Sequence, residues 1–264
     1  MSPQGAAVRV RGLVTRLGGR TIHDGLDLEI PPGAVVGVVG ASGSGKSVLL
    51  RTLLGLIPPA AGRIEVLGVD VQRAGPAARA ALERRRGVLF QDGALFSTLT
   101  VLENVLVPLR RFTRLERRLL ERLALSKIRL AGLPADVAGR RPDALSGGMR
   151  KRAGLARAIA LDPEILFLDE PTAGLDPIGA AAFDELLARL ARTLGLTVVM
   201  VTHDLDTLLG VCSRIAVLCD GRIVAEGPVD RVVAADHPWV KEYFHGARGR
   251  IAVAARRHGR REDT

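Results

Sequence analysis

A glycine-rich turn near residue 40 constrains the fold more than any other part of the sequence. It reads Gly40-Ala-Ser-Gly-Ser-Gly-Lys46-Ser47, with an apolar stretch, Ala34 to Val39, before it and an amphipathic stretch, Val48 to Leu56, after it. A strand, a turn with this spacing and a helix form a phosphate-binding loop. The glycines let successive N–H groups point at phosphate oxygens, and the helix N-terminus adds positive potential. A turn with an incidental lysine is the alternative, which the flanking strand and helix disfavour.

Two acidic residues follow a second buried strand. The strand is predicted over Ile165 to Leu168, and Asp169 and Glu170 come directly after it. Open α/β sheets bind ligands at the carboxyl ends of parallel strands. Beside a phosphate-binding loop, Asp169 is predicted to reach a magnesium ion through its hydration shell, and Glu170 to polarise the water that attacks the terminal phosphate. Without that loop, such an acidic pair would more often be surface charge.

Three further side chains are predicted to belong to the same site. Lys46 supplies a mobile charge for the β- and γ-phosphates, and Ser47 supplies a hydroxyl for Mg²⁺. His203 follows the strand Thr197 to Val201, and so it lies at the end of a strand, as Gly40 and Asp169 do. We therefore expect it to contact the γ-phosphate. A purely structural histidine is the alternative. The remaining histidines have no such context and are given no role: His23, His237, His245 and His258.

Strand and helix patterns alternate along the chain, which predicts an α/β fold with a largely parallel sheet. Between Gly93 and Leu145 the β-branched runs disappear, and helices are predicted over Val101 to Leu109 and Leu115 to Ala131. We interpret this segment as a helical subdomain inserted into the core. Asp220-Gly221, between two short apolar stretches, is typical of a β-hairpin. The other predicted elements are a strand over Val88 to Phe90 and helices over Gly147 to Leu161 and Pro177 to Leu194.

The basic composition does not by itself select a partner. The formal net charge is +10, and basic residues cluster at Arg84 to Arg86, Arg110 to Arg118 and Arg248 to Arg261. Nucleic-acid binding would favour aromatic residues interleaved with the basic ones, and only Phe112 meets that condition in these runs. We therefore expect no nucleic-acid partner. Contact with anionic lipid head groups explains the charge at least as well.

The sequence carries no signal for membrane insertion or export. No apolar stretch approaches the roughly 18 uninterrupted residues that span a bilayer, and residues 1–7 lack the pattern of a signal peptide. The chain is thus expected in the cytoplasm. Its two cysteines, Cys212 and Cys219, lack the spacing of a metal site and are expected to be reduced core thiols.

The C-terminal part gathers three of the eight aromatic residues: Trp239, Tyr243 and Phe244. The i, i+4 spacings Trp239 to Tyr243 and Val240 to Phe244 predict a short helix with an apolar stripe. Two hypotheses stay open for this stripe. It packs on the protein's own core, or it docks on a partner while the arginines that follow lie near acidic protein or lipid.

Leu145-Ser-Gly-Gly-Met149 separates this chain from other proteins with a phosphate-binding loop. Here the sequence resembles the ATP-binding-cassette family over about residues 8 to 235, and Leu145 to Met149 is similar to its LSGGQ signature. The resemblance implies a P-loop (RecA-like) core, an antiparallel β portion and the helical insertion. It implies one domain, with a core over residues 8–92 and 160–235, a helical subdomain over 93–159 and a basic tail over 236–264.

The resemblance also implies ATP and Mg²⁺ as cofactors and a head-to-tail dimer of two copies. In such a dimer the signature of one copy binds the γ-phosphate held by the other. Gln91 matches a glutamine that senses magnesium and couples to membrane subunits, Asp176 matches the D-loop, and His203 matches the switch histidine. Two departures are Met149, where glutamine is usual, and Arg16 or Leu17, where an aromatic residue normally stacks on adenine. The implied contacts of ATP are Gly40, Ala41, Ser42, Gly43, Ser44, Gly45, Lys46, Ser47, Val48, Gln91, Ser146, Gly147 and Gly148, and those of magnesium are Ser47, Gln91 and Asp169.

A sub-family is indicated by Phe90-Gln-Asp-Gly-Ala-Leu-Phe96 and by the methionine in the signature. Both are similar to the ATPases of the Mla and Mce-associated lipid transporters. That resemblance implies ATP-driven phospholipid transport at the cytoplasmic face of the inner membrane, integral-membrane permease subunits, an MCE-domain lipid-binding protein and a STAS-domain regulator. The alternatives are a transporter of organic anions or toxic solvents, and a soluble cassette ATPase acting on ribosomes or DNA. The second is disfavoured because the chain has one phosphate-binding loop and one signature.

Overall fold

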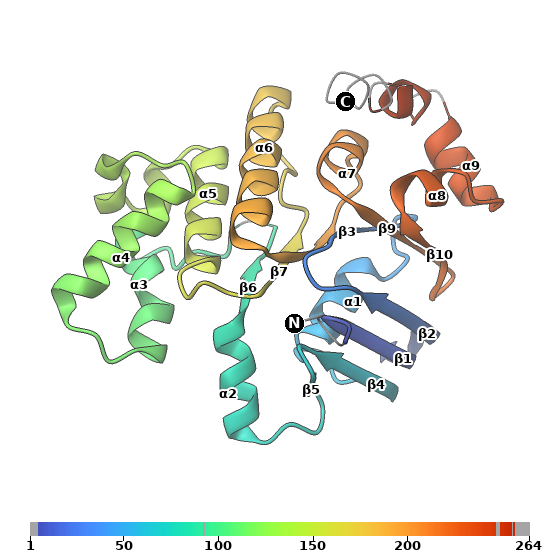
Figure 1. Ribbon diagram of the computed structural model, residues 1–264, viewed down its shortest axis with the longest axis horizontal. Helices are drawn as coiled ribbons and strands as arrows, with labels where there is room; N and C mark the ends of the chain where they lie inside the picture. Colours follow the sequence, from blue (N-terminus) through green and yellow to red (C-terminus); the bar gives the residue numbers. More distant parts are fainter. Residues whose placement is uncertain (1–4, 92, 247–248, 255, 257–264) are drawn as a thin grey trace. The chain divides into compact units, whose positions relative to one another are not determined.

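The computed structural model describes residues 5–91, 93–246, 249–254 and 256. The chain forms two compact units (Figure 1). Unit 1 combines the residues up to Pro76 with those from Val199 onward, and unit 2 comprises Ala77–Val198. Along the chain, unit 2 is therefore inserted into unit 1. The chain returns to unit 1 within the buried strand β8 (Thr197–Val201).

Unit 1 begins with an antiparallel sheet in the order β2-β1-β4-β5, formed by β1 (Val8–Leu17), β2 (Arg20–Ile30), β4 (Ala61–Val66) and β5 (Val69–Asp70). In β1 alternate residues are buried on either side of a register shift, Val8 and Val10 before it and Leu13 and Thr15 after it, each 0% exposed. One face of this sheet thus packs inward, as period-two patterning requires. The antiparallel portion implied by the family resemblance is present.

The second strand group of unit 1 is built around β3 (Val35–Val39), which directly precedes the phosphate-binding loop. It runs parallel to β9 (Arg214–Cys219), and β9 pairs antiparallel with β10 (Arg222–Pro228). The predicted hairpin turn joins them, with φ values of 48° at Asp220 and 74° at Gly221. The helices of unit 1 include α1 (Lys46–Leu53), α7 (Leu205–Val211), α8 (Val229–Val233) and α9 (Pro238–His245), and residues 249–254 are helical as well.

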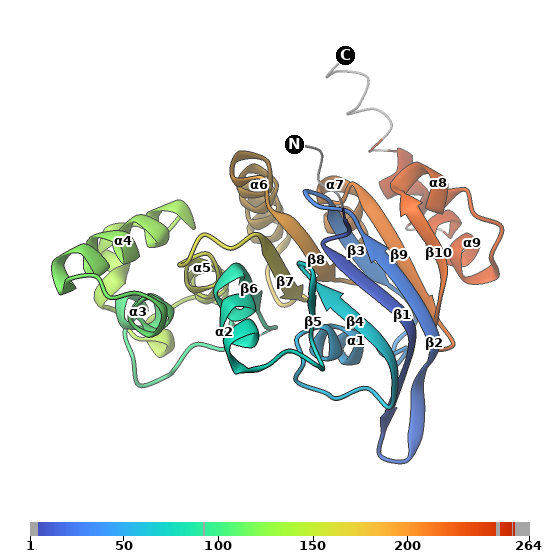
Figure 2. The ribbon, with the colours of Figure 1, turned by 60° about the horizontal axis from the view of Figure 1, so that its bottom comes forward.

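Unit 2 contains the predicted helical insertion. Its helices are α2 (Pro76–Arg85), whose first residue belongs to unit 1, α3 (Val101–Phe112), α4 (Arg117–Leu130), the 3-10 turns η1 (Ala135–Gly139) and η2 (Pro142–Ala144), α5 (Gly147–Ala158) and α6 (Pro177–Leu194). Figure 2 shows α3, α4 and α5 grouped together, and Val105, Ala124 and Ala153 are fully buried between them. β6 (Arg86–Leu89) pairs in parallel with β7 (Ile165–Asp169).

The predicted helices and strands are thus present, with ends that differ by a few residues. The helix after the phosphate-binding loop ends at Leu53 instead of Leu56, because Gly55 adopts a φ of 73°, outside the helical region. The strand order of the antiparallel sheet was not predicted from the residues, since Val and Leu at period two do not choose a partner strand. In the described part of the chain, no helix is long and apolar enough to cross a membrane.

Candidate nucleotide-binding site

The phosphate-binding loop needs glycine at two positions because neighbouring groups leave no room for a side chain. A Cβ atom at Gly40 would lie 2.0 Å from the carbonyl oxygen of Leu218, and one at Gly45 would lie 2.5 Å from Ile22 Cγ2. Gly45 also has a φ of 97°, which disfavours other residues. The predicted reason for the glycines was backbone conformation. The structure adds close packing against β2 and β9.

The interior of the loop fits a phosphate group. Lys46 Nζ donates hydrogen bonds to the carbonyl oxygens of Gly40 at 2.9 Å and Ala41 at 2.8 Å, so its ammonium lies across the loop. Ser44 Oγ is buried and has no hydrogen-bond partner among the described residues. α1 begins at Lys46, and its first turn carries no acidic residue. The Lys46 ammonium, the buried Ser44 hydroxyl and the helix N-terminus together favour the binding of an anion.

His23, to which the sequence gave no role, lies against the end of this loop. It is 0% exposed, and its Nε2 lies 3.2 Å from the carbonyl oxygen of Gly45. Burial lowers the pKa of His23, and the hydrogen bond to Gly45 opposes that shift in part. A neutral histidine with the proton on Nε2 donates to Gly45 and stabilises the turn. No local pattern pointed to this role, because it depends on β2 passing beneath the loop.

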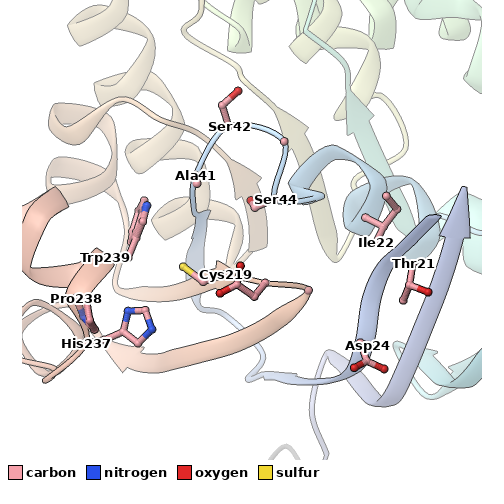
Figure 3. A pocket seen from close by; sticks show the side chains of 13 residues that line it. Thr21, Ile22, Asp24, Ala41, Ser42, Ser44, Cys219, His237, Pro238 and Trp239 are labelled. Atoms are coloured by element: carbon pink, nitrogen blue, oxygen red, sulfur yellow. The ribbon is translucent and has the colours of Figure 1, made fainter.

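A pocket of about 760 Å³ adjoins the loop in unit 1 (Figure 3). Its walls come from Thr21 and Ile22 of β2, the Ala41–Ser44 stretch of the loop, the hairpin after β9, and Trp239 at the start of α9. The thiol of Cys219 lines it, and its pKa is raised by burial and by the Asp220 carboxylate, although Lys46 acts in the opposite direction. Cys212 and Cys219 are both free and buried, so the expected reduced core thiols are present.

His203 lies in unit 1, between β8 and α7, and is exposed. Its carbonyl oxygen accepts a hydrogen bond from the hydroxyl of Tyr243 at 3.0 Å. The Tyr243 ring stacks on Trp239 with ring centroids 4.5 Å apart, whereas Val240 and Phe244 on the same helix are 0% exposed. The apolar stripe of α9 therefore packs within unit 1, as the first of the two hypotheses for it expected.

The acidic pair lies in unit 2, at the end of β7. Asp169 is 4% exposed, and Glu170 follows it with a φ of 47°. A left-handed backbone at a residue with a side chain costs on the order of 1 kcal/mol and needs support from its surroundings. Lys151 Nζ gives such support by donating to the Glu170 carbonyl oxygen at 2.9 Å.

The signature segment also lies in unit 2, where Ser146 forms the N-cap of α5. Its hydroxyl accepts a hydrogen bond from the Met149 N–H at 3.3 Å. Gly147 is exposed, and an added Cβ at Gly147 or Gly148 would meet nothing closer than Leu175 Cδ2 at 3.9 Å. Space around this helix start is thus open to an anion, which is the geometry expected of the signature.

The predicted site residues divide between the two units. The Gly40–Val48 stretch and His203 belong to unit 1, whereas Gln91, the signature, Asp169 and Glu170 belong to unit 2. Gln91 is exposed just after β6. Among the described residues, no three His, Cys, Asp or Glu side chains group to hold a metal ion. The magnesium contacts expected from the sequence are divided in the same way, with Ser47 in unit 1 and with Gln91 and Asp169 in unit 2.

Comparison with known proteins gives a consistent result. The family model described as ABC transporter matches residues 23–173. The methionine import ATP-binding protein MetN of Caulobacter vibrioides is 42% identical over 240 residues, which cover 90% of this chain and 71% of the relative. The probable ribonucleotide transport ATP-binding protein mkl of Mycobacterium leprae is 37% identical over 246 residues, or 93% of this chain and 71% of that protein.

Another relative is matched over nearly its whole length. The intermembrane phospholipid transport system ATP-binding protein MlaF of Escherichia coli K12 is 37% identical over 239 residues, covering 90% of this chain and 88% of MlaF. Among solved structures, the ATP-binding cassette MJ0796, dimeric in a post-hydrolysis state with ADP and Pi, superimposes with a TM-score of 0.77 at 30% identity. That match covers 84% of this chain and 98% of the cassette.

Proposed function

Because the chain belongs to the ABC transporter family, whose cassettes hydrolyse ATP, we propose that it drives phospholipid transport across the cell envelope. The observation that carries the lipid assignment is the match to MlaF over 88% of that protein's length. Two residue patterns support it. They are the Gly-Ala-Leu-Phe stretch, Gly93 to Phe96, shortly after Gln91, and Met149 at the end of the signature, which resemble this sub-family.

The residues take the following roles in this proposal. Lys46 neutralises charge on the β- and γ-phosphates, while the loop N–H groups and the start of α1 hold them in place. Ser47, Gln91 and Asp169 provide the protein's contacts to magnesium, which would supply charge stabilisation in the transition state. The Glu170 carboxylate accepts a hydrogen bond from the attacking water and polarises it, and His203 contacts the γ-phosphate.

Two copies of the chain are proposed to close head to tail on ATP. The support is the open start of α5 at Ser146, which presents N–H groups to an anion but belongs to a different unit from its own phosphate-binding loop. The dimeric state of the MJ0796 cassette agrees with this arrangement. Integral-membrane permease subunits complete the proposed assembly at the cytoplasmic face of the membrane. An MCE-domain protein and a STAS-domain regulator are further proposed partners.

The test is transport by the reconstituted complex. The affinity-tagged chain is purified together with its membrane partners and inserted into liposomes that contain fluorescent phospholipid. Transfer of the lipid to acceptor vesicles or to a lipid-binding partner should require ATP and should stop in the Glu170→Gln variant. ATP hydrolysis that stays uncoupled from phospholipid movement, under conditions where another solute is transported, would refute the lipid assignment.

Methionine import is the second candidate, because MetN shows 42% identity, a higher value than MlaF. The same liposomes decide between the two. ATP-dependent accumulation of labelled methionine without lipid transfer would establish this alternative, and lipid transfer without methionine uptake would exclude it.

A further inference from the structure

Lys151 is a buried cation that no predicted motif explains. It lies near the start of α5, shortly after the signature, and is only 5% exposed. Its Nζ donates a hydrogen bond to the main-chain carbonyl oxygen of Glu170 at 2.9 Å. A buried ammonium is costly unless polar groups surround it, so this contact fixes both partners. The side chain thus ties the signature helix to the residue that is proposed to polarise water.

The carbonyl of Glu170 is held from a second direction as well. It accepts a hydrogen bond from the Ala173 N–H at 3.2 Å, which closes a turn directly after β7. Glu170 itself has a φ of 47°, a conformation that residues with side chains rarely adopt. The direction of its carboxylate depends on that backbone conformation. Donors that hold the carbonyl therefore also hold the direction of the Cα–Cβ bond from which the carboxylate extends.

The turn and the signature helix share a second contact. The Leu175 side chain borders the first turn of α5, because Cβ atoms built at Gly147 and Gly148 would be within ordinary van der Waals range of Leu175 Cδ2, at 3.9 Å. The Leu175 N–H in turn donates to the carbonyl oxygen of Thr172. The segment after Glu170 therefore follows α5 from Lys151 back to the signature.

We propose that Lys151 is a positioning residue for Glu170. Its ammonium holds the Glu170 carbonyl, so that the carboxylate meets the attacking water, and it makes the position of the carboxylate depend on the position of the signature helix. The proposal rests on the proposed role of Glu170 in hydrolysis. A misplacement of a catalytic group by about 1 Å can cost roughly a hundredfold in rate.

The test compares kinetic constants of the full-length chain. Lys151→Met keeps most of the apolar stem of the side chain, is one atom shorter and removes the donor. We expect kcat for ATP hydrolysis to fall by about ten- to a hundredfold, with KM and nucleotide affinity unchanged. The ATP-induced dimer should persist, as in Glu170→Gln, because the groups that bind ATP remain. Lys151→Arg retains a cationic donor and should recover most of kcat.

A matched control is available in the same unit. Lys127 is also buried, at 8% exposure, but pairs with Asp162 and does not contact Glu170. Lys127→Met should lower the thermal midpoint without a selective loss of kcat. A wild-type kcat in Lys151→Met would overturn the proposal. So would a loss of kcat accompanied by loss of the ATP-induced dimer, because that pattern indicates general damage to α5.

Two further variants make the result decisive. If Lys151→Met does not fold, Lys151→Gln replaces it. The glutamine amide is one atom closer to the main chain than the lysine ammonium, so it holds the Glu170 carbonyl less well, and kcat should fall, although less than in Lys151→Met. A wild-type kcat in Lys151→Gln would then overturn the proposal. In the Glu170→Gln background, Lys151→Met should cause no further loss, and an additional loss would contradict action through Glu170. Wild-type hydrolysis by Glu170→Gln alone would instead refute the role of Glu170 and leave the proposed transport function to its own assay.

Discussion

Glu170 illustrates how a single side chain separates hydrolysis from binding. It is half-buried at the end of β7, whereas the groups proposed to bind phosphate lie in the Gly40–Val48 loop. Glu170→Gln should therefore reduce the hydrolysis rate by about a hundredfold or more and preserve nucleotide binding. Lys46 and magnesium remain, so the closed dimer should accumulate. Size-exclusion chromatography with ATP measures the dimer, and hydrolysis at the wild-type rate within the assembled transporter would show the assignment to be wrong.

His23 makes a pH-dependent contribution to stability. Burial lowers its pKa in the folded protein below the ordinary value of 6.5, so the unfolded chain binds a proton first as the pH falls. The contribution of His23 to the free energy of unfolding is thus fully present above about pH 6.5 and decreases below it. Urea unfolding at pH 7.5 and pH 5.5 should show a smaller difference in His23→Phe than in the wild type.

His245 is exposed, and its Nε2 lies 2.9 Å from the Val233 carbonyl oxygen, so His245→Gln serves as the comparison variant. A larger change in the pH difference in His23→Phe than in His245→Gln assigns the pH dependence to His23. An unchanged difference in His23→Phe would mean that other groups cause the pH dependence. The same variant should also weaken ATP binding, because the Gly45 carbonyl loses its partner under the loop.

At the scale of elements, one buried asparagine fixes the segment before α3. Asn104 is 0% exposed; its side chain accepts a hydrogen bond from the Phe96 N–H and donates to the carbonyl oxygens of Phe96, Leu99 and Thr100. Asn104→Ala removes these side-chain hydrogen bonds. The carbonyl oxygens of Phe96 and Thr100 keep their backbone donors, but the Phe96 N–H loses its acceptor, so the change should cost about 1–3 kcal/mol in the free energy of unfolding. Thr98→Ala, at an exposed position of the same segment, should cost far less.

The same segment is proposed to receive a cytoplasmic helix of the permease, with Gln91 to Phe96 and the helices up to Ala131 forming the groove. Phe96 is 51% exposed, and Arg157 lies over its ring at 6.0 Å. A cysteine at Thr98 should cross-link to the permease, and the two native thiols are buried, so background is low. Thr100 is a poorer position because it caps α3. Capture of soluble proteins alone would contradict this groove.

At the scale of the whole molecule, helix α9 packs as part of unit 1. Val240 and Phe244 are fully buried in unit 1, and Tyr243 bonds the His203 carbonyl. Truncation after Pro238 should lower the stability of the isolated chain by roughly 3–5 kcal/mol, since each such side chain contributes about 1.5–3 kcal/mol. Thermal unfolding of the truncated and the full-length chain measures this loss. Weakened assembly of a truncated but equally stable chain would restore the partner-docking hypothesis.

The sequence by itself determined the class of fold, the phosphate-binding loop and the helical insertion. Glycine spacing, strand-sized apolar runs and N-cap residues are local, and they act through backbone conformation and periodicity. The division of the chain into a core over residues 8–92 and 160–235 and a subdomain over 93–159 stays a prediction, as do the individual ATP and magnesium contacts.

The tertiary structure alone decided which side chains support the site. His23 meets Gly45, Lys151 meets Glu170 and Tyr243 meets His203, at sequence separations of 22, 19 and 40 residues. No local pattern specifies such contacts, because any buried polar side chain needs a partner and the sequence does not say which one. The partner is set by which strands and helices pack together, and that arrangement places a histidine under the loop and a lysine against the backbone of Glu170.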